Sequence, residues 1–192
     1  MIDISATIRQ HLAMVTSLDA QTPLIAQIAE RMVQCIHKKG KILWMGNGGS
    51  AADCQHLAAE LVGRFTRERK ALPSIALTTD SSILTAIGND YGYERIFQRQ
   101  VAALCRPEDV VVGISTSGNS PNILHALNSA KQLGAWTVGF TGGEGGQLKL
   151  VADCCLIIPS PITARIQEGH ILVGHILCDW IESAMMKMEK YV

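Results

Sequence analysis

The segment WMGNGGSAADCQHLAAELVGRF, residues 44–65, joins an apolar run to a helix-like pattern through a glycine-rich turn. Glycines let a backbone come close to a ligand, and the first turn of a helix presents unpaired N–H groups and a partial positive charge. The turn from Gly46 to Ser50 therefore predicts an anion-binding loop between a strand and a helix. His56 and Glu60 lie four residues apart in that helix, so their side chains share one face.

A histidine and a carboxylate at this spacing can hold one metal ion together. They can equally form a plain surface contact, which is the commoner case for such a pair taken alone. Their position favours the metal, because His56 follows the glycine loop by barely two turns and so lies near a bound substrate. The loop matches neither the G-x-G-x-x-G dinucleotide fingerprint nor a Walker motif with its lysine, so a nucleotide cofactor is not supported.

The rest of the chain alternates strand and helix patterns. Buried strands are expected at residues 41–45, 73–77, 109–115, 135–140 and 153–159. Helices are expected at residues 2–18, 22–40, 50–62 and 121–134 and from about Thr163 to Lys190, with helical pieces over 80–104 that break near Gly88–Gly92. The pattern predicts an α/β fold: a three-layer α-β-α sandwich around a five-stranded parallel sheet, preceded by N-terminal helices, as one domain over residues 1–192. Ligands should lie beyond the carboxyl ends of the strands.

A second loop, STSGNS at residues 115–120, also lies between a strand and a helix. It offers four hydroxyl groups, from Ser115, Thr116, Ser117 and Ser120, ahead of a helix that has a proline in its first turn. Hydroxyl and helix N–H donors suit phosphate oxygens, so the loop predicts a monophosphate cradle. The alternative is that Ser120 caps the helix and the rest is a polar turn. A third loop, TGGEGG at 141–146, reads as a flexible turn.

Composition narrows the class of protein. The 192 residues are 47% apolar and 18% charged with a net charge of zero, which is typical of a folded chain without the basic footprint of a nucleic-acid binder. The basic run RFTRERK at 64–70 reads as a solvated loop. No signal peptide opens the sequence and no apolar run approaches the ~20 residues of a membrane span, so we expect a cytoplasmic protein without a membrane partner. The six cysteines form no C-x-x-C pair and read as reduced core thiols, with Cys154 and Cys155 on opposite faces of a strand.

The last helix carries Gln167, Glu168, His170 and His175 in a mostly apolar setting. Its apolar residues wrap widely around the axis, and a helix that is apolar on more than one face is buried on more than one face. In a chain of this length that pattern suggests a partner subunit. Histidines buried there need polar partners, and a lone buried histidine is usually a core residue.

Four motifs together resemble one known family. They are GNGGSAADCQHLAAELVGRF (46–65), GNDYGYERIF (88–97), GISTSGNSPNI (113–123) and ARIQEGHILVGHIL (164–177). They look like the phosphoheptose isomerases, the sedoheptulose 7-phosphate isomerases of the SIS (sugar isomerase) fold, and the similarity extends along nearly the whole chain. The STSGN loop alone would indicate only a phosphosugar-binding SIS domain, whereas the His/Glu helix and the RIQE helix narrow the resemblance to the isomerase.

The resemblance implies an aldose–ketose isomerase that converts sedoheptulose 7-phosphate to D-glycero-D-manno-heptose 7-phosphate through an enediol, the first step of ADP-heptose biosynthesis for the lipopolysaccharide core. It implies a homotetramer with active sites at subunit boundaries, in which residues 1–40 pack in the oligomer interface. One zinc ion per subunit would be held by His56, Glu60, Gln167 and His175, with Glu60 and His175 as the acid/base pair. Substrate contacts would come from Asn47, Gly48, Gly49, Ser50, Glu60, Asn89, Asp90, Ser115, Thr116, Ser117, Ser120 and Gln167.

Helix geometry leaves the metal ligands partly open. Gln167 and His175 lie ~12 Å apart along a helix and ~80° apart around it, so they reach one ion only with long side chains, from different subunits or across a local distortion. His170 is nearer to Gln167 and stays open as a ligand.

Three other functions stay open. Some relatives are non-catalytic SIS tetramers that bind the replication initiator protein, and the resemblance implies that these lack the helix glutamate that Glu60 supplies here. A ligand-sensing regulator would usually carry a DNA-binding module, for which the first ~40 residues are too few and too neutral. An isomerase of another phosphosugar is the third alternative.

Overall fold

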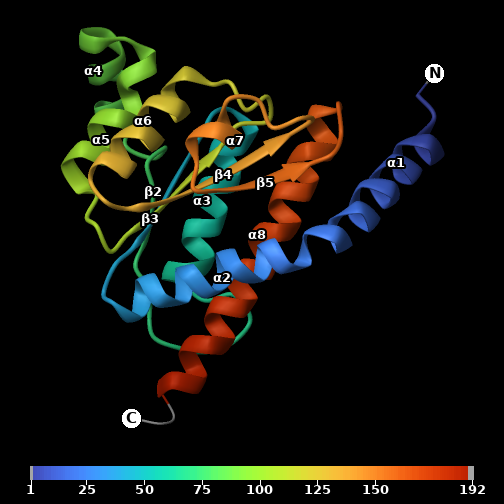
Figure 1. Ribbon diagram of the computed structural model, residues 1–192, viewed down its shortest axis with the longest axis horizontal. Coiled ribbons are helices and arrows are strands. Elements are labelled where there is room, and N and C mark those ends of the chain that lie inside the picture. The colour runs from blue at the N-terminus through green and yellow to red at the C-terminus, as the bar shows by residue number, and fades with distance from the viewer. Residues whose placement is uncertain (1, 190–192) are drawn as a thin grey trace.

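The computed structural model describes residues 2–189 and shows a three-layer α/β arrangement around one parallel sheet (Figure 1). The strands are β1 (Ile42–Gly46), β2 (Ser74–Ala76), β3 (Val110–Ile114), β4 (Trp136–Gly142) and β5 (Cys154–Ile158). The α-helices are α1 (Ile4–Ser17), α2 (Thr22–His37), α3 (Gly49–Val62), α4 (Ser81–Tyr91), α5 (Ile96–Leu104), α6 (Pro121–Gln132), α7 (Leu148–Val151) and α8 (Thr163–Glu189), and the 3₁₀ helices are η1 (Leu18–Gln21) and η2 (Tyr93–Arg95). The predicted fold class is confirmed, and Lys190 of the expected last helix lies outside the described residues.

The five strands pair in the order β2-β1-β3-β4-β5, and every pairing is parallel. Successive side chains of a strand point to opposite faces. In β1, Ile42 and Trp44 pack with α2, α3 and α8, whereas Leu43 and Met45 pack with α5 and α6. Strands β1 and β3 are buried on both faces along their whole length, which explains their continuous apolar runs.

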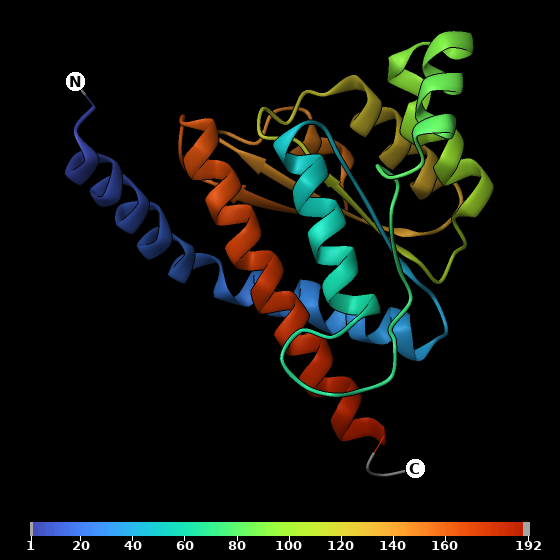
Figure 2. The same ribbon diagram turned by 180° about the vertical axis from the view of Figure 1, so that it is seen from behind.

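Helices α3 and α8 lie side by side on one face of the sheet (Figure 2). Both run in the same direction, because Gly49 at the start of α3 meets Gln167 near the start of α8, and Leu57 meets Gly174 further along. A Cβ at Gly174 would lie 2.6 Å from a methyl carbon of Leu57, so this glycine permits the close approach of the two helices. The histidines and carboxylates of the two helices are brought within reach of each other by this contact.

The break expected near Gly88–Gly92 is confirmed and falls at Gly92, which has a φ of 90° that favours glycine, whereas α4 passes through Gly88 without interruption. One other local prediction is corrected in part. The basic loop 64–70 is mostly solvated, as expected, but the Arg69 side chain is only 2% exposed. Arg69 is therefore part of the folded structure, paired with Glu182, although its place in a basic run predicted exposure to solvent.

The structure agrees with two further expectations, one for the cysteines and one for the hydropathy of the helices. All six cysteines are free, and Cys154 and Cys155 pack on opposite faces of the sheet. Within residues 2–189, the model contains no helix with the length and hydropathy of a membrane span.

His170 lies fully buried on α8 beneath β4. Its Nε2 lies 3.0 Å from the carbonyl oxygen of Thr141 and donates a hydrogen bond to it, and its ring packs on Phe140 at a centroid distance of 5.6 Å. Nδ1 has no hydrogen-bond partner among the described residues. Burial lowers the pKa of His170 from 6.5 to about 4, against the opposing effect of the Thr141 carbonyl. His170 is therefore a neutral core residue.

This buried imidazole predicts a pH dependence of stability. Between pH 6.5 and 4 the unfolded chain binds a proton at His170 while the folded chain does not, so stability falls as the pH falls. The expected loss across this window is about 3 kcal/mol. Urea unfolding at fixed protein concentration should show it, and His170→Gln, which keeps a donor for Thr141, should flatten it. Equal slopes for the two proteins would contradict this account.

Candidate active site

The site lies between β1 and β3, where the order in which strands are added to the sheet changes direction. Strands β1 and β3 are neighbours, but the helices that follow them, α3 and α6, lie on opposite faces. Such a switch point opens a crevice at the carboxyl ends of the two strands. The two loops there are tied by a reciprocal amide pair, because Asn47 donates to Asn122 at 3.0 Å and Asn122 donates back at 2.8 Å. The Tyr93 hydroxyl donates to Asn47 at 3.1 Å.

Three hydroxyl groups gather in the second loop. The Ser115 Oγ lies 2.9 Å from the Ser120 Oγ and 3.5 Å from the Ser117 Oγ, at the start of α6. Ser120 occupies the expected cap position, yet its side chain makes no capping bond to the helix. The alternative reading of this loop as a simple cap is therefore not supported, and the hydroxyls can serve an anion beside the helix N-terminus.

The third loop, predicted as a flexible turn, buttresses the second. Gly118 has a φ of 68°, and a Cβ there would overlap the carbonyl of Gly145. The Gln147 N–H donates to the Asn119 side chain at 3.0 Å, and the Leu148 N–H donates to the Gly118 carbonyl at 2.9 Å. The two loops are therefore packed backbone to backbone. A cavity of about 450 Å³ opens beside them, with Thr116, Ser117, Gly143, Ser160 and Thr163 in its wall.

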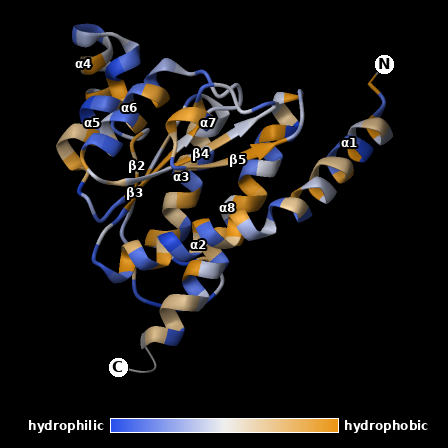
Figure 3. Ribbon diagram, in the orientation of Figure 1, coloured by the Kyte–Doolittle hydropathy of each residue, from blue (hydrophilic) through white to orange (hydrophobic). Residues whose placement is uncertain are grey.

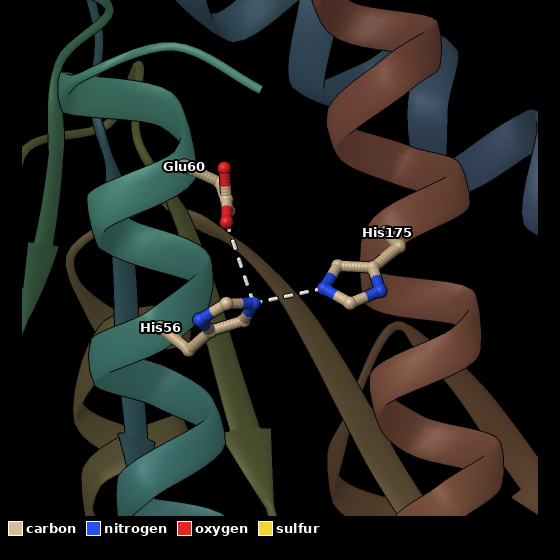
Figure 4. Close-up of side chains that lie close together, drawn as sticks. All are labelled: His56, Glu60 and His175. Carbon is tan, nitrogen blue, oxygen red and sulfur yellow. Dashed lines mark hydrogen bonds and ion pairs between the residues drawn. The ribbon is translucent and has the colours of Figure 1, made fainter. Parts of the chain in front are cut away.

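A second cluster lies between α3 and α8. The Nε2 atoms of His56 and His175 are 2.9 Å apart, and the Glu60 Oε1 lies 3.4 Å from His56 Nε2 (Figure 4). The ligand atoms of all three residues lie within 4.8 Å of one another. His56 and Glu60 come from one face of α3, and His175 faces them from α8.

These three residues fit a metal ion. Two imidazole nitrogens and a carboxylate oxygen converge on one small volume, where a cation would satisfy all of their lone pairs at once. Zinc in proteins takes nitrogen and oxygen ligands of this kind, and three protein ligands leave a position for a substrate oxygen. The residues therefore match the donor set that the sequence predicted at His56, Glu60 and His175.

Gln167 lies elsewhere on α8 in this chain. A Cβ at Gly49 would be 2.5 Å from the Gln167 amide nitrogen, so this side chain lies against the first turn of α3. Gly49 precedes His56 by seven residues, a rise of about 10 Å. Three of the four predicted metal ligands are brought together, and the metal role of Gln167 stays a prediction. His170 is excluded from the cluster by its place in the core.

Most of the predicted substrate residues line the switch point. Asn47, Gly48, Gly49 and Ser50 form the first loop and the start of α3, with Ser50 buried. Asn89 and Asp90 lie apart from them, exposed at the end of α4 and hydrogen-bonded to each other at 2.8 Å. Helix α4 packs on α5 and η2, on the opposite side of the sheet from α3 and α8, so a substrate role for this pair stays a prediction.

Sequence reasoning missed residues that support the site. Asn122 and Tyr93 hold Asn47, and Phe65 stacks on His175 at a centroid distance of 5.5 Å. Asp53 lies one turn before His56 on the same helix, and its buried Oδ2 has no hydrogen-bond partner among the described residues. Burial raises the pKa of Asp53, while the nearby His56 opposes this. Its spacing of three residues from His56 was a signal that the sequence already carried.

The chain is similar to known proteins over most of its length. Residues 7–142 match the model of the SIS domain. The chain is 56% identical over 183 residues to the phosphoheptose isomerase of Trichlorobacter lovleyi, covering 95% of this chain and 93% of that protein. It is 57% identical over 171 residues to the phosphoheptose isomerase of a Roseiflexus species, covering 89% and 87% of the two chains.

Solved structures give the same result. The phosphoheptose isomerase of Neisseria gonorrhoeae superposes with a TM-score of 0.89 at 45% identity, covering 94% of this chain and 97% of that one. The enzyme from Francisella tularensis gives a TM-score of 0.90 at 41% identity, covering 94% and 96%. From its fold, its loops, its His/Glu/His cluster and these relatives, the chain belongs to the phosphoheptose isomerases of the SIS-domain family and is an enzyme that acts on a phosphosugar.

Proposed function

We propose that this enzyme converts sedoheptulose 7-phosphate into D-glycero-D-manno-heptose 7-phosphate with a zinc ion bound by His56, Glu60 and His175. The observation that carries the proposal is the convergence of these three side chains within 4.8 Å of one another, in a chain whose relatives are phosphoheptose isomerases. Gln167 is proposed as a further ligand once substrate or a neighbouring subunit is in place. The product would enter ADP-heptose biosynthesis for the lipopolysaccharide core in the cytoplasm.

The hydroxyl loop anchors the substrate. Ser115, Ser117 and Ser120 present their hydroxyls beside the N-terminus of α6, where the helix dipole favours an anion. A phosphate bound there fixes one end of the sugar, so the reacting carbons are held in a defined place. The metal cluster lies two turns down α3 from the glycine loop, a rise of about 10 Å, so the reacting end of the sugar would lie along α3.

The isomerisation moves one proton from C1 to C2 and another from the C1 hydroxyl to the C2 carbonyl oxygen, through a cis-enediol. Glu60 removes the C1 proton and returns it to C2, while His175 transfers the proton between the two oxygens. A bound zinc ion would polarise the carbonyl as a Lewis acid and stabilise negative charge on its oxygen. Glu60 directs Oε1 toward His56, so its second oxygen serves as the base.

Self-association is part of the proposal. Apolar side chains are exposed along α1 at Ile4, Ile8 and Leu12, and along α8 at Ile176 and Trp180. Hydrophobic residues recur along both helices (Figure 3). A homotetramer would bury these surfaces. It would also allow a neighbouring copy to supply Asn89 and Asp90, which lie away from the metal cluster of their own chain.

The direct test is incubation of the purified protein with sedoheptulose 7-phosphate, followed by NMR detection of the aldose. We expect conversion by the protein as isolated, loss of conversion with a strong chelator, and recovery when zinc is restored. Conversion that is insensitive to complete metal removal would refute the metal centre. No conversion under any metal condition would favour a non-catalytic SIS protein.

Glu60→Gln should lower kcat by about 10²–10⁴-fold, because the amide cannot accept the C1 proton. Circular dichroism and phosphosugar binding should stay close to those of the wild type, since Glu60 is partly exposed and lies away from the hydroxyl loop. Glu68→Gln, an exposed change in the following loop, is the matched control and should leave turnover unaltered. Near-normal turnover of Glu60→Gln would rule out the assigned base.

Ser120→Ala should raise KM for the phosphosugar by about 10-fold or more with a smaller effect on kcat, because one hydrogen bond to a charged phosphate is lost. Steady-state kinetics measure both parameters. Ser129→Ala, further along the same helix, should change neither. An unchanged KM in Ser120→Ala would place the phosphate outside this loop.

A further inference from the structure

The buried carboxylate of Glu182 lies about two helical turns beyond His175 on α8. Glu182 on α8 is fully buried and accepts hydrogen bonds from the backbone N–H groups of Phe65, Thr66 and Arg67 at 3.0, 2.9 and 3.0 Å, and from the Thr66 hydroxyl at 3.1 Å. Three successive N–H groups therefore converge on one side chain. The loop that follows α3 is thereby fastened to α8.

Arg69 completes this junction from the α3 side. Its guanidinium donates to the carbonyls of Glu60, Leu61 and Gly63 at 2.8, 2.8 and 3.1 Å, which are carbonyls that the end of a helix leaves without partners. Its Nε lies 3.3 Å from the Glu182 Oε1, and the two side chains are 2% and 0% exposed. The pair thus joins the end of the helix that carries His56 and Glu60 to the helix that carries His175.

Phe65 transmits this junction to the imidazole. Its backbone is held by Glu182, and its ring lies 5.5 Å from the His175 ring at an interplanar angle of 31°. The His175 ring also meets His56 edge-on at 5.1 Å. His175 therefore contacts both Phe65 and His56, and one of its two ring contacts comes from the 64–70 loop.

We infer that the Arg69–Glu182 ion pair positions the candidate metal centre, by fixing the rotation and spacing of α3 against α8 and by holding Phe65 on His175. The inference rests on the proposed metal site but concerns residues that touch neither metal nor substrate. Glu182 accepts four hydrogen bonds, whereas the Arg69 Nε that faces it makes none among the described residues, so their attraction is that of an ion pair. In some proteins a buried ion pair specifies one arrangement of the elements that it joins. Burial alone would raise the pKa of Glu182, but the backbone N–H groups of Thr66, Phe65 and Arg67 lower it below 4.5, so the carboxylate is charged at neutral pH.

The test variant is Glu182→Gln, which keeps the shape but removes the charge that faces Arg69 and the N–H groups. The matched control is Asp109→Asn, because Asp109 is also a buried carboxylate, paired with Lys41 at 2.6 Å and accepting the Lys41 and Arg106 N–H groups. It immediately precedes β3, the central strand, and its side-chain hydrogen bonds go to Lys41 and Arg106 and not to α3 or α8. Both variants should lose stability, and only Glu182→Gln should disturb the histidines.

Two measurements separate positioning from plain stability. The first is the NMR chemical shift of the His175 ring protons in metal-free, sugar-free protein, where the ring current of Phe65 acts on them. The second is zinc affinity by competition with a chromophoric chelator. Glu182→Gln should move the His175 signals and weaken zinc binding by about 10–100-fold, as loss of a supporting contact around a metal ligand typically does, whereas Asp109→Asn should change neither.

The inference is overturned if folded Glu182→Gln keeps both the wild-type His175 shift and the wild-type zinc affinity, or if Asp109→Asn lowers zinc affinity equally. Should Glu182→Gln fail to fold, Phe65→Leu carries the test, and an unchanged zinc affinity in that variant is equally fatal. A wild type that binds no zinc would refute the proposed metal centre. The metal-free NMR measurement would then still decide whether Glu182 orients His175.

Discussion

The close parallel packing of α3 against α8 is the contact on which the candidate site depends. Neither helix alone carries a metal centre, because α3 supplies one imidazole and one carboxylate and α8 supplies the second imidazole. The contact between Leu57 and Gly174 sets the spacing at which the two Nε2 atoms come within 2.9 Å. The arrangement of the three side chains is therefore a consequence of helix packing. Any change that moves the two helices apart would separate these side chains even if none of the three residues were replaced.

The sheet supplies the other half of the site. Its switch point brings the loops after β1 and β3 together, and the glycine loop after β4 packs on the second of them. Backbone donors and hydroxyls are thereby concentrated at one edge, while the imidazoles lie further along the helices on one face. In the proposed function, anion binding and proton transfer would therefore take place at different positions, and the substrate would have to reach both.

The sequence predicted the strands and helices of this fold and two of the residues in the cluster. The contacts between distant residues could not be predicted, and the reason is physical. Continuous apolar runs predicted the strands within about two residues, as with 109–115 against Val110–Ile114, because strands buried on both faces cannot hide their composition. The pairing of His56 with His175 joins residues 119 apart and exists only once α3 and α8 pack. Arg69 was expected in solvent because basic runs usually are, and its carbonyl partners appear only where α3 ends.

The reciprocal amides of Asn47 and Asn122 have a consequence for the two turns that they join. Each amide is both donor and acceptor to the other, so the glycine turn and the hydroxyl turn share one rigid frame. Neither turn can be displaced alone without stranding a partner that lies in part-buried surroundings. A change at either asparagine therefore acts on both turns at once.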